Sequence, residues 1–315
     1  MSIIRRRLMK QAEEEEERRK FVHFEDKEVR DVFVRAFDKD GDGRISYTEA
    51  AEVTDEEFSK ISLKNTKAKV LIELGYFYNV TKLPQGFCYN RYIEKMVIPK
   101  NIKSIGSYNF NNINSNTLEL IIEGSPIIPE FTMSVARLVV VKAGVSTLNF
   151  ANIMSFWFNV DPDSQSYSSY DGSVLSKDGK ILYKARFLED KGIYVTPPNV
   201  KIIGGHSLRN NASKTIISEG VTSIWGYAIF NNASIIKMDF PTSLISFNSN
   251  SIFGNRNLAT IVFRNPTAVD FPKSLFSGCP SISAVYVPDE SIEEYKGKLS
   301  QLADKILPLS QYVDN

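Results

Sequence analysis

The stretch VTSIWGYAIFNN, residues 221–232, decides the fold, because its pattern returns twice along the chain. The second copy is LISFNSNSIFGN at 244–255, and the third is AVDFPKSLFSGC at 268–279. The phenylalanines towards the end of the copies, Phe230, Phe253 and Phe276, follow one another at intervals of 23 residues. A fixed period of this length is typical of a solenoid, in which each repeat forms one turn.

A short β-prone run accompanies each copy. These runs are Thr215–Ile217, Ile235–Met238, Thr260–Phe263 and Ala284–Val287, with fainter copies at Lys95–Pro99 before Ile102–Gly106 and at Ile193–Pro197 before Val200–Gly204. A unit this short cannot bury its apolar face alone, so neighbouring units must stack into one continuous core. From about residue 59 to residue 315 we therefore predict a mainly β solenoid of short parallel strands. The Asn or Cys after each Phe falls where the chain turns back, so we expect Cys279 to be a turn or core residue.

The period is interrupted at about residues 158–185. Within this stretch, Asp178-Gly179 separates two β-prone runs, which predicts a hairpin with a positive-φ turn. The preceding polar segment, residues 161–170, carries tyrosines and is either a functional loop or a solvated decoration.

Near the N-terminus, residues 38–49 fill every ligand position of an EF-hand calcium loop. The predicted metal ligands are Asp38, Asp40 and Asp42, the backbone carbonyl of Arg44, Ser46 through a water, and Glu49 bidentately. Gly43 stands where the chain must turn sharply, and Ile45 is expected to pack beneath the loop. Seven oxygens suit Ca²⁺ better than Mg²⁺. The alternative is an Asp/Gly-rich turn that binds no ion.

Residues 21–58 form the predicted calcium module and N-terminal cap. Apolar residues at steps of three and four predict an entering helix over Lys27–Phe37, and Thr54 followed by three acids predicts a second helix start. No second loop carries the ligand pattern, whereas sensor EF-hands usually come in pairs. We therefore expect a structural ion rather than a signalling one.

Residues 1–20 form a charged segment in which Glu14 and Arg18, Glu15 and Arg19, and Glu16 and Lys20 are each four residues apart, the favourable order on a helix. We expect an attachment helix that docks on a protein partner, the alternative being a disordered leader. The first residues contain no apolar region of a secretory signal, so we do not expect export by the general route.

Composition excludes several classes of function. With 43% hydrophobic residues and a net charge of +1, the chain can bury a core but lacks the charge of a nucleic-acid-binding protein. No apolar run approaches the ~18 residues of a membrane span, so no membrane insertion is expected. Two cysteines make no disulfide framework.

No catalytic constellation is present in the sequence, and we expect no enzyme. His206 is interpreted as a turn residue of a repeat. Asp161 and Asp163 could form a glycosidase dyad, but the proline between them favours a turn.

The repeat pattern, Val-x-x-Ile followed by Phe-x-x-Cys or Phe-x-Asn, resembles the BspA-like leucine-rich repeats of surface and phage-associated proteins of gut anaerobes. The segment 158–180 looks like the hairpin that interrupts repeats in that family, and the ending from Val285 through Tyr295 is similar to its C-terminal cap, placed here at about 284–315. The pairing of these repeats with an N-terminal EF-hand also resembles members of that family. The resemblance covers roughly residues 22–315 and is least regular at 107–150. It implies a leucine-rich-repeat solenoid.

Three functions remain open at this point. The first is a non-enzymatic binding protein tethered by residues 1–20 to a phage virion, which needs no secretion signal. The second is a cell-surface adhesin of the same fold, and the third, a remote one, is a carbohydrate-active enzyme. The solenoid would bind a surface protein or a glycan, and a homo-oligomer is not excluded.

Overall fold

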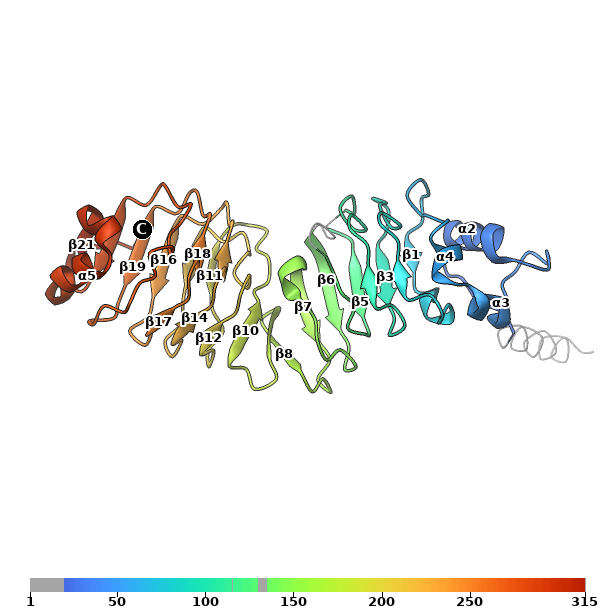
Figure 1. The fold of residues 1–315 in the computed structure, drawn as a ribbon, viewed down its shortest axis with the longest axis horizontal. Helices are drawn as coiled ribbons and strands as arrows, with labels where there is room; N and C mark the ends of the chain where they lie inside the picture. Colours follow the sequence, from blue (N-terminus) through green and yellow to red (C-terminus); the bar gives the residue numbers. More distant parts are fainter. Residues whose placement is uncertain (1–19, 115, 130–134, 315) are drawn as a thin grey trace, which may run out of the picture. The chain divides into compact units, whose positions relative to one another are not determined.

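A computed structural model of the chain describes residues 20–114, 116–129 and 135–314. Residues 1–19 of the predicted attachment segment therefore lie outside the described residues. The chain divides into two compact units, Met1–Ile153 and Met154–Asn315. Both units consist mainly of short parallel strands stacked turn upon turn (Figure 1). The mainly β solenoid predicted from the repeat period is therefore confirmed.

The first unit begins with three short helices, α2 (Lys27–Phe37), α3 (Tyr47–Glu52) and α4 (Asp55–Phe58). The helix α2 has the predicted bounds, and the Asp26 carboxylate caps it by accepting from the N–H groups of Glu28 and Val29. Thr54 caps α4 in a capping box with Glu57, as its sequence predicts.

The strands of the first unit lie in two parallel sheets. One sheet contains, in this order, β1 (Val70–Leu71), β3 (Lys95–Ile98), β5 (Glu119–Ile122) and β6 (Val135–Val141). The other pairs β2 (Lys82–Leu83) with β4 (Ser104–Ile105). Two 3₁₀ helices, η1 (Glu73–Tyr76) and η2 (Phe150–Asn152), connect the turns. The register from Glu119 to Leu138 advances by a shorter step than the 23-residue period, which explains why the repeats look irregular here.

The helices pack directly on the first turns of this unit. Phe33 of α2 lies 5.0 Å from Phe77, and Phe58 of α4 lies 5.0 Å from Phe87, measured between ring centroids. These rings are fully buried. The Asp55 carboxylate accepts hydrogen bonds from the Thr81 N–H at 2.7 Å and the Thr81 hydroxyl at 2.6 Å. The helical module and the first repeats therefore share one core.

The second unit contains the regular repeats. One sheet has the order β11 (Ile193–Val195), β13 (Lys214–Ile216), β16 (Lys237–Phe240), β19 (Thr260–Phe263), β20 (Ala284–Val287) and β21 (Ile306–Pro308), all parallel. A second sheet contains β12 (Ile202–Ile203), β14 (Ser223–Ile224) and β17 (Ser246–Phe247), and β15 (Ile229–Phe230) pairs with β18 (Ile252–Phe253). Lys214 pairs with Lys237 and Lys237 with Thr260, which is the 23-residue period seen in the register.

A hairpin interrupts the parallel order, where the sequence predicts one. The strands concerned are β7 (Met154–Val160), β8 (Tyr167–Tyr170), β9 (Ser173–Ser176) and β10 (Ile181–Lys184). The strands β8, β9 and β10 are antiparallel neighbours, and Gly179 between β9 and β10 has a φ of 73°. Only after β10 does the sheet continue in parallel, with β12.

Beyond β20 the chain forms η3 (Asp289–Ser291), α5 (Ile292–Lys298), η4 (Ser300–Lys305) and, after β21, η5 (Leu309–Gln311). Tyr295 of α5 is 1% exposed, and its hydroxyl donates to the carbonyl of Asn265 at 2.8 Å. This segment therefore covers the last turn of the repeats.

A ladder of buried polar side chains joins successive turns. The Asn255 side chain accepts from the Asn232 N–H at 2.9 Å and donates to the Ile229 carbonyl at 2.8 Å. One turn later, the Cys279 thiol donates to the Ile252 carbonyl at 3.3 Å. Cys279, expected to be a turn or core residue, is buried and bonds to the backbone of the preceding turn.

Candidate metal centre

The acidic loop connects α2 to α3. Gly41 and Gly43 have φ values of 78° and 80°, the left-handed region in which a side chain would be strained. These two residues let the loop curl back so that its carboxylates point inward. The turn that the sequence assigns to Gly43 is present.

The structure brings the first three predicted ligands together. A carboxylate oxygen from each of Asp38, Asp40 and Asp42 lies within 4.8 Å of the others. Asp38 accepts from the N–H groups of Gly41 at 2.7 Å and Gly43 at 2.8 Å, and the loop is thereby folded round this side chain. Three like charges at this separation repel one another, and a cation among them would relieve that repulsion.

Glu49 is held differently from the other acids. Its side chain is 8% exposed, and it stands outside the cluster of three carboxylates. One carboxylate oxygen accepts from the Lys39 N–H at 2.8 Å, and the other from the N–H and the hydroxyl of Ser46, each at 2.8 Å. Burial raises the pKa of Glu49, but the hydrogen bonds from Ser46 and Lys39 outweigh it, so the net shift lowers the pKa.

The two other predicted ligands also have defined places. Ser46 is the N-cap of α3, and its Oγ accepts from the Glu49 N–H at 3.2 Å. The guanidinium of Arg44 lies 3.4 Å from a carboxylate oxygen of Asp42 and 3.9 Å from the centroid of the Phe21 ring. The side chain of Arg44 therefore points to the loop surface, as expected for a residue whose ligand would be its carbonyl.

A short extended segment braces the end of the loop, a feature that sequence reasoning missed. The Val22 N–H donates to the Ile45 carbonyl at 2.8 Å, and the Tyr47 N–H donates to the Lys20 carbonyl at 3.1 Å. Ile45 is 1% exposed beneath the loop, as predicted. The β-prone residues Phe21 and Val22 were the available signal.

Two carboxylates, one of them buried, anchor the module to the repeats. Glu73 of η1 is 1% exposed and accepts from the N–H groups of Glu25 at 2.8 Å and Ile72 at 3.0 Å. Burial raises the pKa of Glu73. Asp26, the cap of α2, also accepts from the Lys69 N–H at 2.6 Å. The position of the acidic loop is thus tied to the first strand of the solenoid.

The remaining acidic and histidine residues considered in the sequence lie in or beside turns. The Asp161 carboxylate accepts from the Asp163 N–H at 3.1 Å, which is turn chemistry. His206 has a φ of 57°, and its ring stacks on Tyr227 with 5.8 Å between centroids, as expected of a repeat-turn residue.

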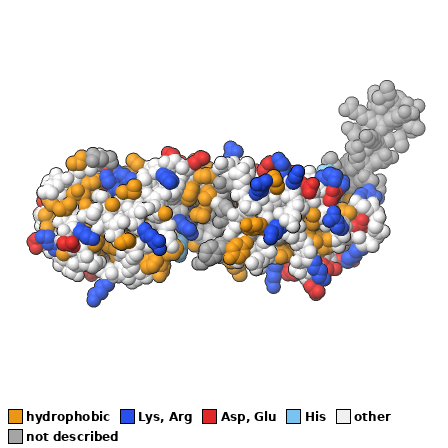
Figure 2. Space-filling model, turned by 90° about the horizontal axis from the view of Figure 1, so that it is seen from above, with side chains coloured by type: hydrophobic (Ala, Val, Ile, Leu, Met, Phe, Trp, Pro, Cys, Tyr) orange, Lys and Arg blue, Asp and Glu red, His pale blue; other side chains and the backbone are white. Residues whose placement is uncertain are grey.

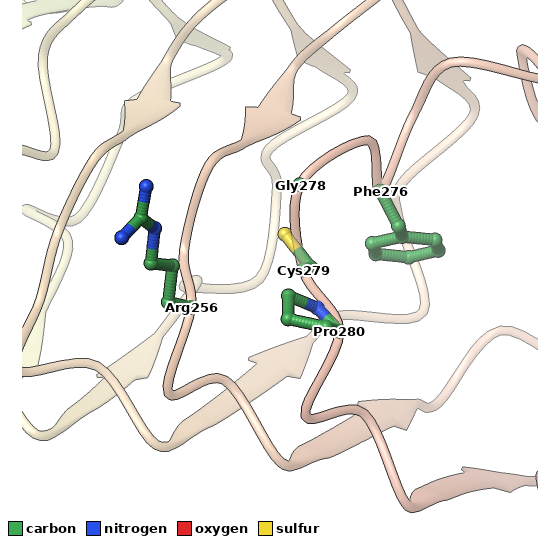
Figure 3. A pocket seen from close by; sticks show the side chains of 5 residues that line it. All are labelled: Arg256, Phe276, Gly278, Cys279 and Pro280. Atoms are coloured by element: carbon green, nitrogen blue, oxygen red, sulfur yellow. The ribbon is translucent and has the colours of Figure 1, made fainter.

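A shallow pocket in the second unit is lined by Arg256, Phe276, Gly278, Cys279 and Pro280 (Figure 3). Cys279 lies between Arg256 and Phe276 in this view, and burial raises the pKa of its thiol. The protonated thiol is a poor nucleophile. The pocket is therefore an unpromising site for covalent chemistry.

Residues 81–125 and 188–298 match the family model described as BspA type leucine rich repeat region, in six copies. The chain contains BspA-type leucine-rich repeats. The matched segments include β3 and β5 of the first unit and the strands from β11 to β20 of the second. The hairpin between them lies outside the BspA-type match.

Three solved structures show similarity to this chain. The pneumococcal vaccine antigen PcpA has 15% sequence identity, with a TM-score of 0.45 over 76% of this chain and 75% of that one. A leucine-rich repeat protein from Eubacterium ventriosum has 16% identity, a TM-score of 0.46, and coverage of 67% and 64%. A leucine rich cell surface protein from Faecalibacterium prausnitzii has 13% identity, a TM-score of 0.32, and coverage of 66% and 83%. No curated protein matches the sequence significantly.

Within the described residues, no helix has the length and apolar character needed to cross a membrane. On the face drawn in Figure 2, Lys and Arg side chains are dispersed among other residues rather than joined in one stripe.

Proposed function

We propose that this leucine-rich-repeat chain is a non-enzymatic binding and structural protein whose N-terminal calcium loop stabilises the solenoid. The observation that carries the proposal is the coupling of the acidic loop to the repeats. The helix that leads into the loop contributes Phe33 and Phe37 to the buried cluster round Phe77, a residue of the first turn.

The donor set of the loop suits a hard cation. Asp38, Asp40 and Asp42 would hold Ca²⁺ through their clustered oxygens, with the Arg44 carbonyl and Ser46 completing the set. One carboxylate oxygen of Glu49 already accepts from both the N–H and the hydroxyl of Ser46, so Glu49 would exchange part of this bonding for the ion on joining the set. The bound ion would neutralise the negative charge of the three aspartates.

Calcium binding would stabilise the folded module rather than switch it. An ion that binds only the folded state adds RT ln(1 + [L]/Kd) to the free energy of unfolding, about 2.7 kcal/mol at a hundredfold excess over Kd. Because the loop and the first turns share one core, this gain in unfolding free energy would extend to the N-terminal turns of the solenoid.

The segment 1–20 would tether the protein to a larger assembly, which we propose is a phage virion. Its support is the spacing of Glu14, Glu15 and Glu16 before Arg18, Arg19 and Lys20. The repeat region would then face outward and bind a surface protein or a glycan. We propose neither a nucleic-acid partner nor membrane insertion.

The test compares the full chain with a chain that lacks residues 2–18, keeping Lys20 because its carbonyl accepts from Tyr47. We expect the full chain to co-sediment with virions, and the shortened chain to fold, bind calcium and stay in the supernatant. Matched envelope fractions of the host bacteria serve as the control. Recovery in the envelope fraction, not with virions, would instead identify a cell-surface adhesin.

A further inference from the structure

Two lysines stand side by side on the outer face of the second unit. Lys214 of β13 and Lys237 of β16 are direct partners in the parallel register, so their side chains project from adjacent strands. Their side chains are only 12% and 15% exposed. Both ammonium groups contact one carboxylate, that of Asp314, and the distance from Lys237 Nζ is 3.1 Å.

Asp314 reaches the lysines because the segment after β21 returns across the sheet towards β16 and β19 (Figure 1). Ser310 fixes the start of this tail by donating from its N–H and its hydroxyl to the Asp289 carboxylate, at 3.0 and 2.5 Å. The Tyr312 ring lies 5.1 Å from the Tyr286 ring and 4.8 Å from Lys237 Nζ. The Tyr312 hydroxyl donates to Asp314 at 2.9 Å.

The neighbouring acid on this face cannot replace Asp314. Asp239 of β16 is bound at both carboxylate oxygens by the guanidinium of Arg264, at 2.8 and 2.7 Å. Among the described residues, Asp314 is therefore the carboxylate that the two lysines share. Hydrogen bonds from Lys214, Tyr312 and Lys237 hold the pKa of Asp314 well below its usual range, so this group is charged at neutral pH.

The tail covers part of a longer face. Ile193 of β11 is in register with Lys214 and Lys237, and Val195 of β11 is in register with Val262 of β19. Ile193 and Val195 are 58% and 54% exposed, whereas Val262 is fully buried. The last residues of the tail are open to solvent, because Val313 is 68% exposed and the Asp314 side chain 55% exposed. The carboxylate side of this ion pair faces solvent, so another carboxylate could compete with Asp314 for the two lysines.

We propose that the Lys214–Lys237 pair is a binding site for an acidic peptide segment of a partner protein, and that the chain's own tail occupies it as an internal competitor. The tail defines the chemistry of the ligand: an aromatic ring against Tyr286 and Lys237, and a carboxylate two residues later between the lysines. This inference deepens the proposed binding role of the repeat region and rests on it.

The test uses a peptide with the sequence of residues 309–314, an uncharged fluorescent label without a carboxylate and an amidated C-terminus, so that its aspartate is the sole carboxylate. Its binding is measured by fluorescence anisotropy to the full chain, to the full chain with Asp314→Asn, and to a chain that ends at Gln311. We expect the shortened chain to bind at least tenfold more tightly than the full chain, with Asp314→Asn in between.

Further variants locate the site. In the shortened chain, Lys214→Met with Lys237→Met should lower the affinity at least tenfold, whereas Lys201→Met with Lys273→Met, two exposed lysines elsewhere on the unit, should leave it unchanged. Thermal melting checks that each variant is folded. The proposal is overturned if the shortened chain binds no better than the full chain, or if a peptide with Asn in place of Asp binds equally well. Either result would leave the virion and calcium tests of the proposed function unaffected.

Discussion

The carboxylate of Glu73 accepts a hydrogen bond from the backbone N–H of Glu25 at 2.8 Å, across 48 residues of sequence. Glu73 belongs to the first turn of the solenoid, and Glu25 immediately precedes the cap of α2. This bond therefore fixes the start of the helical module on the repeat region. A buried acid is used here as a structural acceptor and not as a metal ligand.

Replacing Glu73 with alanine should destabilise the first unit by roughly 1–3 kcal/mol, because the N–H groups of Glu25 and Ile72 lose their acceptor. Urea unfolding followed by near-ultraviolet circular dichroism would measure the loss. The control is Glu94→Ala, since Glu94 makes a surface ion pair with Lys69 at 2.8 Å. Equal stability of the two variants would contradict the anchoring role of Glu73.

Calcium should raise the melting temperature of the chain, and Asp40→Asn should weaken calcium affinity by at least tenfold. Asp40 is exposed and accepts only from the Asp42 N–H among the bonds described, so its replacement removes a charge with little structural cost. Isothermal calorimetry measures the affinity. Glu49→Gln should act in the same direction, and Glu28→Gln, an exposed acid in the first turn of α2, provides the matched control.

A melting experiment with a chelator can contradict the assignment of the loop as a calcium site. If chelation leaves the melting temperature of the wild-type chain unchanged, the loop is an Asp/Gly-rich turn held by its own hydrogen bonds.

Lys184 should make the second unit more stable as pH rises above neutrality. The side chain is 1% exposed, and burial, aided by the charge of Arg209, lowers its pKa to about 7. Between pH 7 and the ordinary pKa of 10.5, the unfolded chain binds a proton that the folded chain does not, so stability increases with pH. The gain from pH 7 to pH 9 should be roughly 2 kcal/mol.

The check is denaturant unfolding of wild type and Lys184→Met across this pH range. The variant loses the hydrogen bond from Lys184 Nζ to the His206 carbonyl, and it should also lose most of the pH dependence. Lys177→Met, at an exposed position, should keep the wild-type profile. A flat wild-type profile would show that Lys184 stays charged in the folded chain.

Asn255→Ala should lower the free energy of unfolding by roughly 1–3 kcal/mol more than Asn257→Ala, a substitution at a nearby exposed position. The first change leaves the Asn232 N–H and the Ile229 carbonyl without a partner inside the core. The second removes one hydrogen bond to the Ala233 carbonyl at the surface. Thermal unfolding of the two variants in parallel makes the comparison, and identical melting would argue against the ladder as a stabilising element.

The sequence predicts the parts of the fold that repeat or that are local. The spacing of Phe230, Phe253 and Phe276 predicts the stacking, Thr54 with its following acids predicts the start of α4, and Asp178-Gly179 predicts a hairpin turn. Each of these signals lies within one turn of chain or recurs at a fixed interval. For the same reason, the irregular region between β5 and β6 gives only weak signals.

Contacts between distant segments could not be predicted in this way. Nothing periodic links Lys20 and Val22 to the end of the acidic loop, or Asp314 to Lys214 and Lys237. The burial of Lys184 also contradicts the ordinary preference of lysine for the surface. In the candidate site, the sequence predicts the cluster of three aspartates, but the capping bonds that hold Glu49 depend on the fold of the loop and α3.

The ladder that runs from Asn232 through Asn255 to Cys279 has an evolutionary consequence. Because each rung bonds to the backbone of the preceding turn, a gain or loss of a few residues within a turn would misalign every later rung. Duplication or deletion of one whole turn keeps all rungs aligned. Related genes should therefore differ in length by multiples of about 23 codons, with the helical start and the α5 ending retained as fixed terminal pieces.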